Sequence, residues 1–216
     1  PPPPPPPPPP PSSQERPLPD LEPKIDEVST VEGAKTVLVI APGSGTRNFQ
    51  KALYEYMTKT YTVRTALMTA AYGGPKPNEF SGPYQKAMAK WLLEDMVANP
   101  PSLVYAASRG GAILANVLNL ATDEQLKAFA NTRFLVINTF IPEGRDILHT
   151  TRKPALKNRL TVFSGGEDVS SSEKDSDTLS AWLKSHWNGK YEYTHKEDQP
   201  HGVVVTPEEF EAALAL

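Results

Sequence analysis

One serine in this sequence has the surroundings of a nucleophile presented by a tight turn. Ser108 follows the apolar run 102–107, and a pattern typical of an amphipathic helix begins directly behind it. A strand that turns sharply into a helix strains the residue at the turn and leaves its side chain clear of the backbone. The chain at such a turn requires small residues two positions before and after the serine, and here these are Ala106 and Gly110. The stretch predicts a nucleophilic serine in an A-x-S-x-G form of the G-x-S-x-G motif, although Ser-x-Gly-Gly also occurs in ordinary loops.

A serine nucleophile needs a base that accepts its proton, and His201 is the preferred candidate. It lies in Gln-Pro-His-Gly, after the last expected strand and before the last expected helix. His149 is an alternative, because its loop could reach the same edge of a sheet. His186 falls near the end of an amphipathic helical pattern, where a solvated or capping role is more typical, and His195 lies inside the last expected strand.

The base in turn needs an acid that orients it, and Asp168 is the preferred candidate. It ends Gly-Gly-Glu-Asp, directly after the apolar run 160–163, and the glycines allow the chain to turn back sharply. Glu167 is the neighbouring alternative. A surface turn with an acidic helix cap would also explain these residues. The chain order serine, acid, histidine favours the catalytic interpretation.

A second glycine-rich turn, Pro42–Gly45, follows the apolar run 36–41. It lacks the Gly-Lys-Ser/Thr of a P-loop and the third glycine of a dinucleotide-binding motif, so a phosphate cradle is disfavoured. Open backbone N–H groups at such a turn can stabilise an oxyanion. We expect the amides of Arg109 and Ser44 to form this oxyanion hole, with an ordinary strand-to-helix turn as the alternative.

Unbroken aliphatic runs alternate with helical patterns along the chain, and this alternation predicts the architecture. Such strands are typical of a mostly parallel central sheet with helices on both faces, an α/β fold. Ligands of these sheets bind beyond the carboxyl ends of the strands, where all three turns described above are expected to meet. Expected strands cover 36–41, 61–68, 102–107, 134–138, 160–163 and 191–195, the last nearer the sheet edge; helical patterns include 49–57, 84–92, 113–118, 179–183 and a last helix capped by Thr206.

The chain divides into residues 1–33 and a domain of residues 34–216. Eleven prolines open it and predict an extended polyproline II segment, which serves either as a spacer or as a ligand for a polyproline-binding protein. Residues 12–33 carry six acidic and two basic residues, which suggests a disordered or docking tail. The remainder of the 216-residue chain is nearly neutral.

Composition excludes several classes of function. Basic residues are scattered, so nucleic acid is not an expected partner, and no apolar run is long enough to span a membrane. The chain has no cysteine, which excludes disulfides and thiolate metal sites. The expected compartment is the cytoplasm, or an organelle after removal of a targeting peptide, and composition does not choose between them.

These motifs, in this order, resemble a small α/β-hydrolase without a cap domain, similar to carboxylesterases, acyl-thioesterases and dienelactone hydrolases. The resemblance covers residues 35–216 and implies hydrolysis of a small acyl ester or thioester, with no metal or organic cofactor. The loop 70–84, with Tyr72, Phe80 and Tyr84, is expected to line the substrate pocket, or else to pack under a long loop. Ala106 and the Pro-Gly-Ser-Gly loop depart from the usual motifs. A non-catalytic binding or structural subunit, docked through its proline-rich tail, is therefore the alternative.

Overall fold

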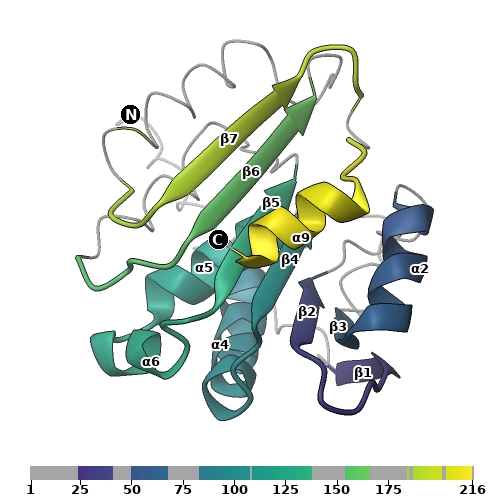
Figure 1. Ribbon diagram of the computed structural model, residues 1–216. Helices are drawn as coiled ribbons and strands as arrows, with labels where there is room; N and C mark the ends of the chain where they lie inside the picture. The colour runs from purple at the N-terminus through teal and green to yellow at the C-terminus, as the bar shows by residue number, and fades with distance from the viewer. Residues whose placement is uncertain are drawn as a thin grey trace, which may run out of the picture.

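The computed structural model describes residues 24–40, 50–67, 83–107, 109–137, 154–165, 184, 187–200 and 203–215. In this part of the chain, seven strands form one sheet in the order β1-β3-β2-β4-β5-β6-β7 (Figure 1). All neighbouring strands are parallel except β1, which pairs with β3 in the antiparallel sense. The strands are β1 Lys24–Ser29, β2 Thr36–Ile40, β3 Thr62–Leu67, β4 Leu103–Ala107, β5 Arg133–Ile137, β6 Leu160–Gly165 and β7 Tyr191–Lys196.

Helices cover both faces of the sheet, as the alternating pattern predicted (Figure 1). One face packs against α4 (Pro83–Ala98), α5 (Arg109–Leu120) and α6 (Asp123–Ala128). The other packs against α2 (Lys51–Thr60) and α9 (Pro207–Ala215). Strands β2, β4 and β5 are buried on both faces, which explains why nearly all of their residues are apolar.

Each face of the sheet has its own hydrophobic core, and successive side chains of a strand point alternately into one core and the other. In β4, Val104 and Ala106 face α4 and α5, whereas Leu103 and Tyr105 face α2 and α9. All four side chains are fully buried. The predicted strands are confirmed to within two residues at each end, and β7 lies at the sheet edge as expected. The helical pattern 179–183 lies outside the described residues.

Residues 24–29 form strand β1, although the sequence analysis assigned them to the tail that ends at residue 33. Their only large aliphatic side chains, Ile25 and Val28, are half-buried. Ser29 adds a local anchor, because its Oγ donates to Tyr61 O (2.8 Å) and accepts from Val63 N–H (3.1 Å). An edge strand needs only one packed face, and its pairing comes from backbone hydrogen bonds. The sheet therefore extends into the acidic segment, while residues 1–23 lie outside the described part.

Candidate active site

Most of the predicted site residues lie outside the described part of the chain. These are Ser44, Tyr72, Phe80, Ser108, Asp168 and His201, together with the alternatives His149, Glu167 and His186. For Arg109 and Tyr84 the structure describes the backbone, in the first turns of α5 and α4. What the structure does describe is the backbone on either side of Ser108 and His201, and the strand that leads to Asp168.

The junction between β4 and α5 leaves room for one residue. The strand ends at Ala107 and the helix begins at Arg109, so Ser108 alone separates them. Behind it, a Cβ atom on Gly110 would lie 2.2 Å from Ile40 O and 3.2 Å from Ile40 C. The first turn of α5 thus rests directly on the carboxyl end of β2, which precedes the segment containing Ser44. An ordinary side chain at position 110 would collide with that backbone.

The contact at Gly110 accounts for the small residue at that position. The atoms nearest to a Cβ on Gly110 belong to Ile40, which is paired with Ala106 in the sheet. Ala106 is fully buried within the core beneath α4 and α5, so its methyl group is accommodated there. The structure thus requires a small residue at position 110 because the first turn of α5 approaches β2.

The segment that contains His201 packs against the end of β6. A Cβ on Gly165 would lie 2.3 Å from Gln199 O, 2.5 Å from Pro200 O and 2.8 Å from Val203 Cγ2. Gly165 is also three residues before Asp168 in the sequence. The backbone on both sides of His201 therefore lies against the strand that leads to the expected acid.

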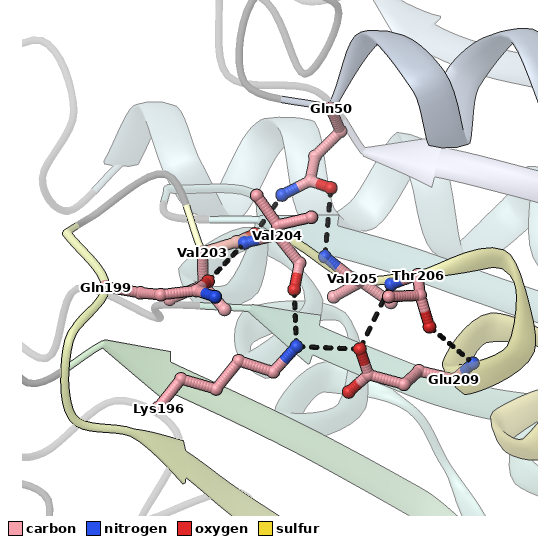
Figure 2. A network of polar contacts seen from close by, with 8 residues as sticks. All are labelled: Gln50, Lys196, Gln199, Val203, Val204, Val205, Thr206 and Glu209. Carbon is pink, nitrogen blue, oxygen red and sulfur yellow. Dashed lines mark hydrogen bonds and ion pairs between the residues drawn. The ribbon is translucent and has the colours of Figure 1, made fainter.

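Beyond His201, side chains rather than a neighbouring strand bind the backbone of residues 203–206 (Figure 2). On one side, Gln50 Nε2 donates to Val203 O, and Val205 N–H donates to Gln50 Oε1 (3.2 Å). On the other, Val204 N–H donates to Gln199 Oε1 (2.7 Å), and Lys196 Nζ donates to Val204 O (2.6 Å).

An ion pair joins the end of β7 to α9. Lys196 Nζ lies 2.7 Å from Glu209 Oε1 and 5.1 Å from the centre of the Phe163 ring. Glu209 also accepts from Thr206 N–H (3.1 Å), and Thr206 Oγ1 accepts from Glu209 N–H (3.1 Å), which is the capping box expected for the last helix. Partial burial opposes ionisation of Glu209, but the hydrogen bonds from Lys196 and Thr206 and the Lys196 charge outweigh it and lower the pKa of Glu209.

Sequence reasoning missed Gln50. A single glutamine at the start of a helix has no distinctive pattern, and its partners lie about 150 residues further along the chain. Only its burial marks it, because its exposed fraction is 5%. That burial is a property of the folded chain, so the sequence alone offered no signal.

His195 belongs to a separate cluster. Its Nδ1 lies 2.8 Å from Ser164 Oγ, which is also 2.8 Å from the Tyr193 hydroxyl. Ser164 and Gly165 are paired with β7 in regular strand register, so Ser164 is not at a strand-to-helix turn. This cluster joins the edge strand β7 to its neighbour β6.

Among the described residues, no helix combines the length and apolar character needed to cross a bilayer. No group of three or more histidine, aspartate or glutamate side chains there is arranged to hold a metal ion.

Comparison with solved structures identifies the fold. No protein-family model and no curated protein matches the chain. Among solved structures, a Bacillus cereus carboxylesterase superimposes with a TM-score of 0.57 and 16% identity, over 91% of this chain and 92% of its own. The Pyrococcus furiosus esterase Pf2001 gives 0.55 and 17%, over 90% and 88%. An esterase domain from Rhodothermus marinus gives 0.53 and 15%, over 88% and 86%. Together with the sheet order and the helices on both faces, these similarities show that the chain has the α/β-hydrolase fold.

Proposed function

We propose that this protein is a serine hydrolase that cleaves a carboxylic ester or thioester. Ser108 Oγ attacks the acyl carbon while His201 accepts its proton, and Asp168 orients the imidazole. The amides of Arg109 and Ser44 stabilise the oxyanion of the tetrahedral intermediate. His201 then protonates the departing alcohol or thiol. Water, activated by the same imidazole, releases the acid and restores Ser108.

One observation favours this proposal above the others. The backbone passes from β4 to α5 through Ser108 alone, and Gly110 holds the start of that helix against the end of β2. A serine at such a junction faces the carboxyl edge of the sheet, where ligands of open α/β sheets bind. The contact of Gly165 with Gln199 and Pro200 brings the flank of His201 to the end of strand β6, at the same edge of the sheet. The esterases named above share this fold, which supports ester hydrolysis by analogy.

The pocket for the acyl or alcohol group belongs to the same proposal. We assign it to the loop containing Tyr72 and Phe80 and to the start of α4 at Tyr84. The loop precedes α4, and α4 packs against α5, which begins one residue after Ser108. Aromatic side chains there would favour an apolar acyl chain over a charged one.

Labelling with a fluorophosphonate probe tests the nucleophile. We expect the wild type to be labelled, and the Ser108→Ala and His201→Asn variants to lose labelling. Ser164→Ala and His195→Asn are matched controls, because they remove the serine–histidine pair that the structure describes elsewhere. Both controls should keep labelling. A folded wild type that resists the probe, or labelling that follows Ser164, would overturn the assignment.

Hydrolysis of substrates separates the chemical classes. A series of p-nitrophenyl esters of increasing acyl length, and S-acyl thioesters of the same lengths, should each be cleaved by the wild type and not by Ser108→Ala. A Tyr84→Ala change should alter the preferred acyl length more than it alters cleavage of the acetyl ester. Equal losses for every length would remove Tyr84 from the pocket.

A further inference from the structure

We propose that Gln50 is a positioning residue for His201, a role that rests on the proposed function. Its carboxamide binds the backbone two and four residues beyond the histidine and ties it to the start of α2. Because Gln50 directly follows the segment 41–49, which contains Ser44, one side chain joins the two segments that would hold the base and an oxyanion donor. Gln50 acts through the backbone and does not contact the reacting atoms.

The hydrogen bonds of Gln50 replace those of a missing strand. Residues 203–205 belong to no strand of the sheet, so their backbone groups need other partners. In an extended backbone, the C=O of one residue and the N–H two positions later point to the same side. Gln50 meets Val203 O and Val205 N–H on that side, with one donor and one acceptor from a single amide (Figure 2). Gln199 and Lys196 meet the two groups of Val204 on the opposite side.

The position of Gln50 in its own helix supports the same role. It is the N-cap residue of α2, where a Ser, Thr, Asp or Asn side chain usually accepts from the first turn. The Gln50 side chain makes no such capping bond. A buried carboxamide is costly unless its donor and acceptor are both used, and here both are used on the segment after His201. The side chain thus serves that segment in preference to its own helix.

Both flanks of His201 are consequently fixed. Gln199 and Pro200 rest on Gly165 before the histidine, and Gln50 holds Val203 and Val205 after it. Only His201 and Gly202 lie between these two anchors. If the second anchor is removed, we expect the His201 imidazole to be held less precisely for reaction with Ser108. A displacement of about 1 Å can lower a catalytic rate by about a hundredfold.

A matched pair of variants tests this role. Gln50→Met keeps the length of the side chain and removes both hydrogen bonds. Asn158→Leu is the control, because Asn158 is equally buried at 4% exposure and donates two hydrogen bonds to backbone oxygens, those of Phe129 and Thr132 (2.9 and 2.8 Å). Asn158 precedes β6 and lies at the amino end of the sheet, away from the candidate site. Both variants should lower the thermal unfolding midpoint by similar amounts.

Only Gln50→Met should change catalysis. We expect kcat for p-nitrophenyl acetate to fall between about ten- and a hundredfold, with a much smaller change in KM, and the acidic limb of the pH–rate profile to shift. Hydrogen exchange of the Val205 amide, which donates to Gln50, should accelerate in Gln50→Met and not in Asn158→Leu. If kcat and the pH profile of Gln50→Met match those of Asn158→Leu, the positioning role is refuted.

If the proposed function is wrong, the results would differ from those expected if only the positioning role of Gln50 is wrong. In that case the wild type itself would not hydrolyse any ester, whereas the NMR signals of His201 would still report on its position. Gln50→Met should then broaden or shift the His201 ring resonances, identified by their loss in His201→Asn, and leave those of His195 unchanged. Unchanged His201 resonances together with an unchanged Val205 exchange rate would overturn the inference without reference to activity.

Discussion

Replacing Gly110 by alanine provides a test in which two physical effects have opposite signs. Gly110 is the second residue of α5, and alanine is the better helix former by up to about 1 kcal/mol. A free helical position would therefore gain stability from this change. The structure predicts the reverse, because the new Cβ would lie 2.2 Å from Ile40 O.

The size of the effect follows from that distance. Cβ contacts below 3.0 Å essentially do not occur, so the start of α5 and the end of β2 must separate. The collision is with a backbone oxygen, which cannot rotate away as the end of a side chain can. Overpacking of this kind costs about 1–3 kcal/mol. A contact of 2.2 Å is severe, so we expect a cost in the upper half of this range, about 2–3 kcal/mol. After subtracting about 1 kcal/mol for the gain in helix propensity, we expect the free energy of unfolding to fall by about 1–2 kcal/mol.

The same displacement should affect hydrolysis more strongly than stability. Gly110 lies two residues after Ser108, and Ile40 immediately precedes the segment that contains Ser44. Moving these two elements apart changes the distance between the nucleophile and the oxyanion donors. A loss of about a hundredfold in kcat per folded molecule is the expected scale.

Gly189→Ala is the control for this experiment. Its Cβ would lie 2.3 Å from Asn158 O and 2.7 Å from Lys157 O, also backbone atoms, but before β7 at the amino end of the sheet. Urea unfolding followed by tryptophan fluorescence should show a loss of stability for both variants, and only Gly110→Ala should lose activity per folded molecule. A Gly110→Ala protein that unfolds at the same or a higher urea concentration than the wild type would refute the argument.

Two further predictions concern an ion pair and a buried hydroxyl. Glu209→Gln removes the ion pair with Lys196. Because the folded-state pKa of Glu209 lies below its ordinary value of 4.5, the stability that it contributes is present above about pH 4.5 and is lost as the pH falls through the folded-state pKa. The wild type should exceed the variant by up to about 1 kcal/mol in urea unfolding at pH 7, and a difference that does not shrink as the pH falls below 4.5 would contradict this. Tyr105→Phe removes a fully buried hydroxyl that has no hydrogen-bond partner among the described residues, so the free energy of unfolding should rise by about 1 kcal/mol in the same assay; a fall would mean that the hydroxyl is bonded.

The sequence predicted the central strands well because their physical requirement is simple. A parallel strand covered on both faces must be apolar at every position, and β2 and β4 follow this rule. Strand β1 escaped prediction because it lies at the edge and has only two half-buried aliphatics, Ile25 and Val28, among charged residues. Its pairing with β3 depends on backbone groups, which composition does not reveal.

The sequence indicates the residue types of the candidate site, but it does not reveal the contacts that would support them. A serine between small residues at the end of an apolar run is visible in the sequence, and so is the capping box of Thr206 and Glu209. The bonds from Gln50 to Val203 and Val205 are not, because they join segments about 150 residues apart. Such contacts depend on which distant segments the order of strands in the sheet brings together.

Close approach of a glycine to backbone oxygens does not by itself mark a functional site. Gly110, Gly165 and Gly189 all meet backbone oxygens at a distance that no Cβ tolerates, yet Gly189 lies at the amino end of the sheet, away from the candidate residues. Gly110 and Gly165 differ in being next to the carboxyl ends of parallel strands, and each borders a segment that contains a candidate side chain. We therefore propose catalysis from two features taken together, the position of these segments in the sheet and the chemistry of their residues. A serine follows β4, and the segment that contains the histidine is flanked by contacts with Gly165 and Gln50. If Gly110→Ala and Gly165→Ala each left hydrolysis intact while Gly189→Ala abolished it, this connection between location and chemistry would be lost.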